Sequence, residues 1–488
     1  MSTTVEDRYK TTIGLETHVE LSTSSKMFCG CEVGFAGEPN TRTCPVCLGM
    51  PGSLPVANAT AIEYTLRIAL ALNCTIAPRS LFHRKNYFYP DMPKNYQISQ
   101  YDYPVGSQGF LEISGDFGTK RVGINRVHLE EDTGKSIHVG GSGRIADSDY
   151  SLEDFNRAGT PLVEIVSEPD IGSAEEARAY VTELRALLES LGVSDVRMEE
   201  GSMRVDANVS VALQGAEEFG AKVEVKNMNS IRSVGRALEF EEKRQRDALA
   251  NGETLVQETR HFDEKTSTTS SLRTKEFAFD YRYFPEPDLV PFQPDPEWVE
   301  SIRDALPETP AARRERFATT YGLSDYDVGV LTSSVATSDW FEAAATVYAG
   351  EPKRVANWIS ADLFGLLNEA GIELAQAKIT PAQLAGLVQL VDDGTISGKQ
   401  AKTVLAQMFA SGSDAQDVVA DLGLQQVSDE SALEAAVDEV IAENEDAAAK
   451  VRAGQLNTIG FLVGQVMKKT KGRANPGIVN DLLKRKLG

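Results

Sequence analysis

The amino-acid sequence predicts an α+β fold that is followed by a mostly helical second half. Residues 1 to about 295 alternate strand-like runs with turns and contain two clear helical segments. A proline-rich join at 285–298 then marks a boundary, after which the strand signal vanishes and helical periodicity continues. Because a chain of 488 residues is too long for one ordinary hydrophobic core, we expect domains at 1–295, 296–411 and 412–488.

The first strand is predicted at 13–21, IGLETHVEL, where residues alternate between two faces. The core-facing set is Ile13, Leu15, Thr17, Val19 and Leu21. The opposite set is Gly14, Glu16, His18 and Glu20. This second face is either a solvated strand surface or one wall of a metal site. Strand-like runs at 203–213 and 222–227 extend the predicted sheet.

Two helices of the first part have recognisable ends. The first is predicted to begin after Ser173, where Glu176 completes a capping-box pattern, and to stop at Gly192. The second is predicted at about 230–250, followed by an Asn-Gly pair. Strands with segregated helices of this kind are typical of an α+β domain.

The composition is strongly acidic, with 49 basic and 72 acidic residues and a net charge of −23. This charge normally argues against nucleic-acid binding, but spread along the whole chain it also fits a salt-rich cytoplasm. Local basic clusters are therefore the better guide to partners. No apolar run approaches the roughly 20 residues of a membrane span, and the N-terminus has no apolar signal region. We expect a cytoplasmic protein that does not enter a membrane.

Four of the five cysteines form two short knuckles, C-G-C and C-P-V-C. They are Cys29, Cys31, Cys44 and Cys47. Four thiolates at this spacing close a tetrahedral zinc site with no open position, which indicates a structural role. The alternative is a set of unrelated buried thiols, as we expect for the isolated Cys74.

The Gly-Lys-Ser of 128–139, HLEEDTGKSIHV, suggests a phosphate-binding loop, but that motif needs a glycine where this sequence has Leu129. The glycine-rich 140–144 also lacks the dinucleotide fingerprint, and we expect a hairpin turn there.

Carboxylates remain as the chemical signal of this region. Glu130, Glu131 and Asp132 are oxygen ligands suited to Mg²⁺, although an acidic protein can also place them in a solvated turn. Glu164 lies within an apolar run, so its carboxylate must be paired or metal-bound, or its pKa will rise.

Two further segments offer polar groups. In 82–102, Arg84 and Lys85 stand beside a dense aromatic run that could hold a nucleotide by charge and stacking, or that could form an ordinary aromatic core. The strand at 203–213 carries polar residues on one face: Arg204, Asp206 and Asn208.

Taken together, the motifs resemble those of GatB, the B subunits of tRNA-dependent amidotransferases. The matching segments are IGLETHVEL, RKNYFYPDMPKNYQISQYD, HLEEDTGKS, DFNRAGTPLVEIVSEPD, VRMEEGSMRVDANVS, KNMNS and DYRYFPEPDL, followed by GFLVGQVMKKTKGRANP at 460–476. The resemblance covers nearly the whole chain. The related GatE subunits carry an inserted domain, and no insertion of that size interrupts these segments.

The resemblance implies a ligase. ATP would phosphorylate the side-chain carboxylate of Asp on tRNA(Asn) or of Glu on tRNA(Gln), and ammonia would then displace phosphate to leave the amide. The glutaminase subunit GatA would supply the ammonia, and the small GatC would steady the pair. Two alternatives are a scaffold that only presents tRNA and a free-standing ligase that uses dissolved ammonia.

The resemblance also implies site residues. His18, Glu131 and Glu164 match Mg²⁺ ligands, with Glu16 and Glu130 close by. Lys85 matches a lysine at the phosphorylation site, and Asp206 is expected in the same pocket. The four knuckle cysteines match a zinc site that only some members keep.

The implied fold is an antiparallel-sheet cradle, a helical domain and a tail that resembles the YqeY family. Four basic residues of the tail are the expected tRNA contacts: Lys468, Lys469, Lys471 and Arg473. Their alternative role is to interact with helix dipoles at C-terminal ends.

Overall fold

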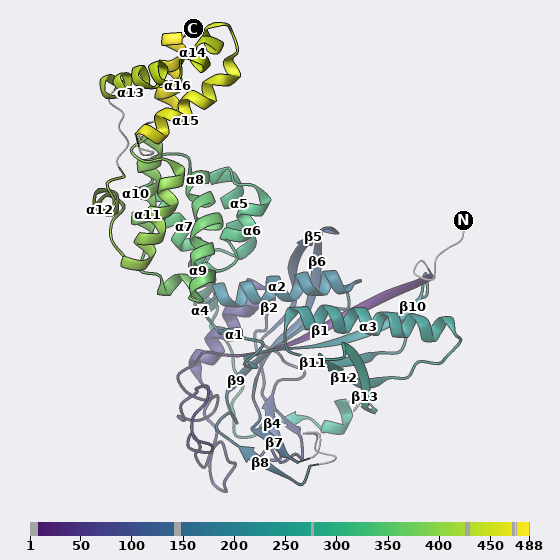
Figure 1. Cartoon of the computed structure of the whole chain (residues 1–488). Coiled ribbons are helices and arrows are strands. Elements are labelled where there is room, and N and C mark those ends of the chain that lie inside the picture. The colour runs from purple at the N-terminus through teal and green to yellow at the C-terminus, as the bar shows by residue number, and fades with distance from the viewer. Residues whose placement is uncertain are drawn as a thin grey trace. The chain divides into compact units, whose positions relative to one another are not determined.

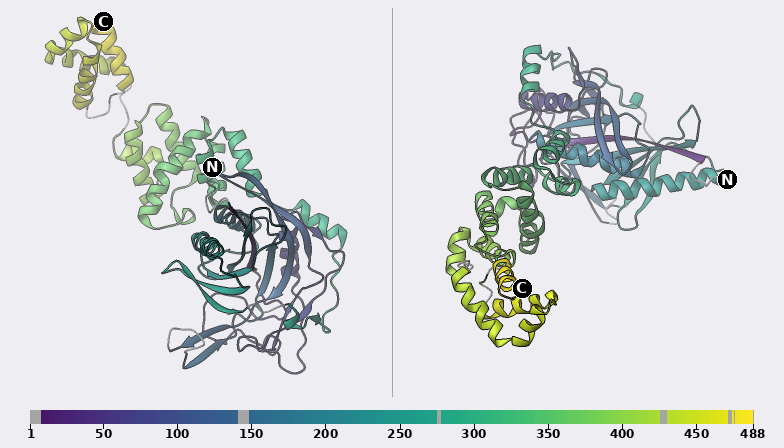
Figure 2. Two further views of the ribbon diagram at one scale, coloured as in Figure 1. Left: turned by 90° about the vertical axis from the view of Figure 1, so that its right-hand side faces the viewer. Right: turned by 90° about the horizontal axis from the view of Figure 1, so that it is seen from above.

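The computed structural model describes residues 8–140, 148–274, 278–424, 430–470, 474 and 476–487. The chain divides into two compact units, Met1–Pro310 and Ala311–Gly488. The first unit is of mixed α+β type, and every element assigned within the described part of the second is a helix. Figures 1 and 2 show these elements from three directions. The division into three domains at 295 and 411 stays a prediction.

A nine-stranded sheet forms the body of the first unit, in the order β13-β12-β11-β10-β1-β9-β6-β5-β2. Strand β1 (Tyr9–Glu20) is central and pairs antiparallel with β10 (Met203–Leu213) and β9 (Pro161–Ser167). The outer strands are β2 (Thr75–Ile76), β5 (Gly106–Gly115), β6 (Gly118–Glu131), β11 (Val223–Met228), β12 (Glu258–Asp263) and β13 (Thr268–Thr274).

The expected antiparallel sheet contains one parallel pair, β11 with β12. Helix α3 (Ile231–Ala250) connects these two strands along the chain. Parallel neighbours need such a crossover, whereas a short hairpin can only join antiparallel strands. The helix that the sequence predicted therefore sets the direction of β12.

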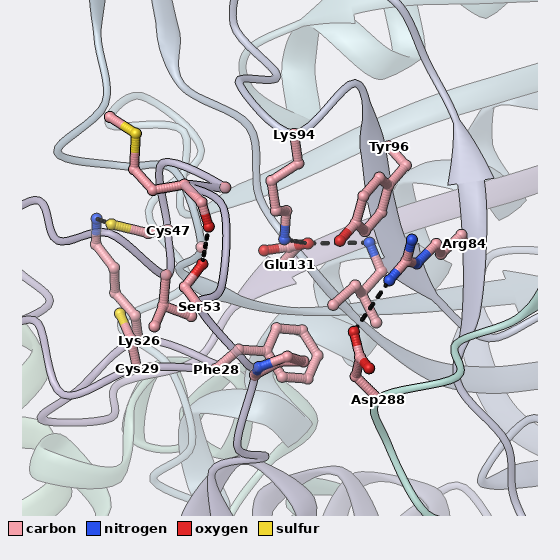
Figure 3. Close-up of a pocket in the computed structure, with 16 residues that line it drawn as sticks. Lys26, Phe28, Cys29, Cys47, Ser53, Arg84, Lys94, Tyr96, Glu131 and Asp288 are labelled. Atoms are coloured by element: carbon pink, nitrogen blue, oxygen red, sulfur yellow. Dashed lines mark hydrogen bonds and ion pairs between the residues drawn. The ribbon is translucent and has the colours of Figure 1, made fainter.

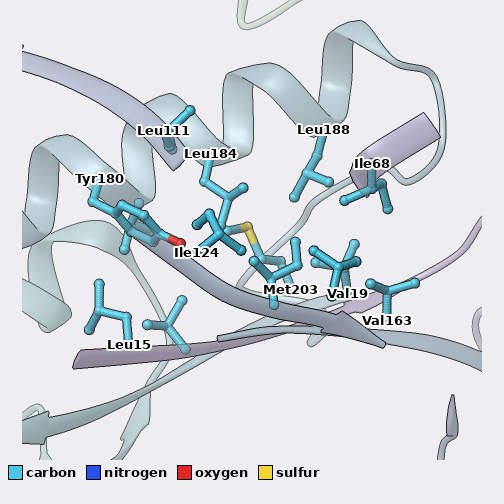
Figure 4. Close-up of a cluster of buried hydrophobic side chains, with 14 of the residues drawn as sticks. Leu15, Val19, Ile68, Leu111, Ile124, Val163, Tyr180, Leu184, Leu188 and Met203 are labelled. Carbon is cyan, nitrogen blue, oxygen red and sulfur yellow. The ribbon is translucent and has the colours of Figure 1, made fainter. Parts of the chain in front are cut away.

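The alternation predicted for β1 is confirmed. Its five core-facing residues are all buried, and the four residues of the opposite face are partly exposed. The buried face packs against helix α2 (Ala174–Ser190), where Tyr180, Leu184 and Leu188 lie over Leu15 and Val19 (Figure 4). Helix α1 (Ala59–Ala71) contributes further residues to the same core. The helices thus occupy one face of β1 and leave the other for polar side chains.

Both predicted helices begin where expected. Ser173 caps α2 by accepting from the Glu176 N–H, and Ser230 caps α3 in the same way. The Glu176 carboxylate does not complete the predicted capping box with Ser173. It accepts instead from the Gly172 N–H and pairs with Lys120 of β6.

Two smaller sheets are also present among the described residues of the first unit. One consists of β14 (Phe284–Pro285), β3 (His83–Asn86) and β4 (Tyr96–Ser99). The other is a ribbon of β7 (Lys135–Val139) and β8 (Tyr150–Asp154). Most of the turn predicted at 140–144 lies outside the described residues. Helices η3 (Ala278–Tyr281) and α4 (Pro296–Asp304) follow.

The helices of the second unit pack around two hydrophobic clusters, one between Phe317 and Val419 and one between Leu433 and Leu487. Those of the first cluster are α5 (Pro310–Tyr321), α6 (Asp325–Leu331), α7 (Val335–Val347), α8 (Pro352–Asn357), η4 (Trp358–Leu363), α9 (Phe364–Ala370), η5 (Leu374–Gln376), α10 (Pro381–Asp392), α11 (Gly398–Ser411) and α12 (Ala415–Asp421). Those of the second are α13 (Glu430–Glu443), α14 (Glu445–Arg452), η6 (Leu456–Thr458), α15 (Ile459–Lys469) and α16 (Pro476–Leu487). None of the helices in the described residues combines the length and apolar character that crossing a bilayer requires.

The contact between α2 and β1 gives a first prediction. Leu184→Ala should lower the free energy of local unfolding at β1 by about 3 kcal/mol, because it removes a fully buried side chain and leaves a cavity. Hydrogen exchange of the β1 amides measures this quantity. The control Arg185→Ala, at an exposed position of the same helix, should change it by less than about 0.5 kcal/mol. Equal effects of the two changes would contradict this account of the core.

Candidate active site and cysteine cluster

Ionisable residues gather on the face of the large sheet that α2 does not cover. On β1 the registers pair His18 with Glu164 of β9 and Glu16 with Asp206 of β10. His128 of β6 lies opposite Glu164 on its other side. Since alternate residues of a strand share a face, these side chains all project from the same surface.

The centre of this surface is a cluster of two histidines and two carboxylates: His18, His128, Glu130 and Glu164. The Nε2 atom of His18 lies 3.6 Å from a carboxylate oxygen of Glu130 and 3.6 Å from one of Glu164. His128 Nε2 lies 3.1 Å from Glu164 and 3.7 Å from Glu130. His128 and both carboxylates are buried, whereas the His18 side chain is 21% exposed. A ligand can therefore reach the cluster from the side on which His18 lies.

The cluster holds its carboxylates in the charged form. Burial alone would raise the pKa of Glu164, but the charge of His128 and its hydrogen bond lower that pKa well below its usual range. Burial would likewise raise the pKa of Glu130, and a hydrogen bond with His128 and the nearby Lys85 ammonium reverse the effect. Burial would lower the pKa of His128, yet the two carboxylates raise it to about 9. The site thus combines two buried carboxylates, Glu130 and Glu164, with positive charges on His128 and Lys85.

Ligand atoms of His18, Glu130 and Glu164 all lie within 4.8 Å of one another, so these residues could hold one metal ion. The two carboxylates supply the hard, charged oxygens that Mg²⁺ prefers, and the imidazole adds a softer third donor. The donor set therefore fits a divalent cation.

Glu131 does not join this set, although the sequence placed it among the Mg²⁺ ligands. It projects from the opposite face of β6, where its carboxylate pairs with Lys94 and accepts a hydrogen bond of 2.9 Å from the Ile98 N–H. Glu130, one residue earlier, occupies the place beside His18. The structure therefore brings together His18, Glu164 and Glu130, and separates them from Glu131.

A second polar group adjoins the cluster on the same face. Asn208 donates to Glu16 over 2.8 Å, and Lys226 Nζ contacts Asp206 at 2.6 Å. Burial would lower the pKa of Lys226, but Asp206 and then Glu224 and Glu16 raise it. Glu16 and Asp206 are thus register neighbours, and Lys226 pairs with Asp206.

Glu20, at the end of the same face, lies in a separate ionic group. Arg157 bridges Glu20 at 3.0 Å and Asp132 at 2.6 Å, and Arg204 also contacts Asp132. Burial and the neighbouring Asp132 raise the pKa of Glu20 to about 7. Asp132 is therefore fixed by two arginines and does not belong to the candidate metal ligands.

The four knuckle cysteines form one cluster, with their sulfur atoms within 4.8 Å of one another. A hydrogen bond from Cys29 is the main cause that lowers the pKa of Cys47 to about 5. Lys26, which is only 1% exposed, lies with its Nζ 3.8 Å from the Cys47 sulfur and donates to the backbone carbonyls of Arg42 and Phe155. Four cysteine sulfur atoms beside a buried ammonium are a donor set that fits a tetrahedral zinc ion.

A pocket of about 210 Å³ lies between this cluster and Glu131 (Figure 3). Cys29 and Cys47 line one side, and Lys94 and Glu131 line the other. Gly49, two residues after the second knuckle, packs on Lys94, since a Cβ added there would lie 2.5 Å from the Lys94 Cγ. The knuckle therefore forms a wall that supports the Lys94–Glu131 pair.

The basic residues of the tail are only partly described. Lys468 and Lys469 are both exposed, and Lys469 pairs with Glu439 at 2.7 Å and with Glu443 at 2.6 Å. Lys471 and Arg473 lie outside the described residues. The charge of Lys469 is therefore already shared with two carboxylates.

Sequence reasoning missed His128, Lys94 and Lys226. The signal for His128 was available, because it precedes Glu130 by two residues and must share its face in a strand. Lys94 and Lys226 had no such signal, since their partners Glu131 and Asp206 are distant along the chain.

Two family models match most of the chain. Residues 11–300 match the family model of the GatB/GatE catalytic domain. The chain belongs to the GatB/GatE family. A second model, described as GatB domain, matches residues 339–487.

Relatives of the family match the chain over its full length. The B subunit of the aspartyl/glutamyl-tRNA(Asn/Gln) amidotransferase of Moorella thermoacetica is 54% identical, across 98% of this chain and 100% of the relative. The protein of the same name from Carboxydothermus hydrogenoformans is 53% identical, across 98% of this chain and 99% of the relative. The resemblance found in the sequence motifs is thus confirmed.

The charge of His128 is open to a direct test. In the metal-free chain its imidazole should titrate near pH 9, above the ordinary 6.5, because two buried carboxylates stabilise the proton. The stability that this proton contributes should be complete below pH 6.5 and be lost as the pH rises through about 9. NMR titration of labelled histidine, assigned with His128→Gln, measures the midpoint. His83 is the internal control, since burial lowers its pKa. A midpoint for His128 at or below 6.5 would contradict the charge assignment.

Proposed function

We propose that this chain is the catalytic subunit of a tRNA-dependent amidotransferase. It would use ATP to phosphorylate the side-chain carboxylate of Asp on tRNA(Asn), of Glu on tRNA(Gln), or of both, and would then convert the acyl phosphate into the amide with ammonia. The names of its full-length relatives support the substrates. The observation that carries the catalytic role is the buried cluster of His18, Glu130 and Glu164 beside Lys85.

The chemistry needs this type of site. A carboxylate is a poor electrophile until one of its oxygens becomes part of a phosphate. Phosphoryl transfer depends mainly on positioning and on neutralising negative charge. His18, Glu130 and Glu164 would hold Mg²⁺, which when bound would neutralise the phosphates of ATP. Lys85 would contribute a further positive charge at the transferred phosphoryl group.

The remaining ionic groups would fix this arrangement. His128 would keep the two carboxylates charged and in place, and Lys226 would hold Asp206 next to Glu16. Glu131, engaged by Lys94, would act on the other face of β6 and not as a metal ligand. A scaffold that only presents tRNA would leave a buried cluster of this kind without a role.

The proposed reaction implies partners and cofactors. GatA would supply ammonia from glutamine, and GatC would steady the complex. The knuckle cysteines would bind zinc in a structural role, since all four positions of a tetrahedron are filled by sulfur. The tail would bind tRNA through Lys468 and the nearby Lys471 and Arg473, and the reaction would take place in the cytoplasm.

Replacement of single cluster residues tests the catalytic role. His18→Ala and Glu130→Gln should each lower ATP-dependent amide formation by at least about 100-fold, because each removes a group that fixes charge at the phosphoryl transfer. Amide formation on Asp-tRNA with ammonium as donor, in the assembled complex, measures this and bypasses the glutaminase.

Glu112→Gln is the matched control, since this carboxylate lies at an exposed position of β5 and pairs with the exposed Arg121. It should retain the wild-type rate. Wild-type rates in the two cluster variants would refute the catalytic role.

The zinc assignment has its own test. The purified chain should contain about one zinc ion, and Cys44→Ser should lose it because three thiolates bind the ion far less tightly than four. Zinc released on denaturation, measured with a chromogenic chelator, gives the stoichiometry. Cys74→Ser changes a buried thiol outside the cluster and should keep the metal. Equal zinc contents in the two variants would rule the cluster out.

A further inference from the structure

Exposed aromatic side chains lie on two segments near Lys85. One follows Lys85 in the chain, at 88–103, and the other contains Phe284. Phe88, Tyr89, Tyr101, Tyr103 and Phe284 are each at least 39% exposed. The two segments are joined by the short sheet in which Phe284 of β14 pairs with Arg84 of β3. An exposed aromatic patch of this kind is unusual unless something binds to it.

Three tyrosines within this region have a defined arrangement. The rings of Tyr101 and Tyr283 are stacked, with centroids 4.4 Å apart and planes inclined by 10°. Tyr281 meets Tyr283 edge to face at 6.1 Å. The Lys85 ammonium lies 4.9 Å from the centre of the Tyr281 ring. The three tyrosines therefore form one connected group, called here the tyrosine platform, and a cation lies over the ring of Tyr281.

This platform borders the proposed phosphorylation site. Ser99, two residues before Tyr101 in the chain, donates from its hydroxyl to a carboxylate oxygen of Glu130 over 3.0 Å. The segment that carries Tyr101 therefore reaches the cluster, and Tyr101, stacked on Tyr283, remains 44% exposed.

The backbone between the tyrosines is held in an unfavourable conformation. Arg282 has a φ of 45°, in the left-handed region that residues with a Cβ rarely occupy. The Asn86 side-chain amide donates to the carbonyl of Tyr281 over 3.0 Å and to that of Arg282 over 2.8 Å. Strain of this kind persists where surrounding contacts impose it, and it is frequent at ligand sites. Asn86 is thus a positioning residue for the two tyrosines.

We propose that Tyr101, Tyr281 and Tyr283 form a stacking platform for the adenine ring of an adenosine ligand. Aromatic side chains stack on every base, and adjacent cations bind the attached phosphates. The inference rests on the proposed function, in which adenosine reaches the cluster from two sources. One is ATP, and the other is the unpaired 3′-terminal adenosine of the charged tRNA.

Steady-state kinetics of the assembled complex tests the platform and separates the two sources. Tyr101→Ala should raise the KM for either ATP or charged tRNA about tenfold. A change of this size lies within the range of affinity that one base–aromatic stack contributes. Tyr101→Phe keeps the ring and should stay within about twofold of the wild type. Tyr326→Ala removes a ring that is 75% exposed in the second unit and is the control for the truncation itself.

A selective rise in the KM for ATP would assign the platform to the adenine of ATP. A selective rise in the KM for charged tRNA would assign it to the terminal adenosine. Unchanged KM values, or an equal rise in both, would overturn the proposal. A wild-type complex that forms no amide would instead refute the proposed function, and direct binding of AMP to wild type and Tyr101→Ala would then decide on the platform.

Discussion

The burial of two carboxylates against two histidines is the constraint on which the site depends. Glu130 and Glu164 are removed from water on the open face of the sheet, and a buried charge is costly unless it is paired. His128 pairs with both. That pairing requires β9 to lie between β1 and β6 in one register, because a shift by one residue would turn each side chain to the helix-covered face. The ion pairs of the site therefore form only in this sheet register.

Neighbouring carboxylates on β6 have different environments because of the alternation of side chains along the strand. Glu130 and Glu131 are adjacent in sequence, but successive residues of a strand point to opposite faces. Glu130 meets His18, whereas Glu131 meets Lys94 in the pocket beside the cysteine cluster. The strand thus separates a candidate metal site from a pocket with a fixed ion pair. The knuckle supports the second through Gly49, which connects a distant structural element to the region around the site.

The cationic groups of this acidic chain are placed where the proposed phosphoryl transfer would need positive charge. Net charge alone argues against a nucleic-acid ligand, yet Lys85 lies near Glu130, Lys226 pairs with Asp206, and two arginines contact Asp132. Several of them are neutralised by carboxylates, so the local field is balanced and not simply positive. Lys469 of the tail is paired in the same way, which explains why counting basic residues overstates the free positive charge.

Local patterns determined much of this protein. Alternation fixed the two faces of β1, capping residues fixed the starts of α2 and α3, and the spacing of the cysteines brought four sulfur atoms into one cluster. Each of these depends on residues that are close in the chain or on motifs with one common geometry. Tertiary structure alone decided that Glu130 and not Glu131 lies beside His18, that β12 runs parallel to β11, and that Tyr283 stacks on Tyr101. These contacts join residues far apart in sequence, and their partners are fixed only when strand order and register are set by packing.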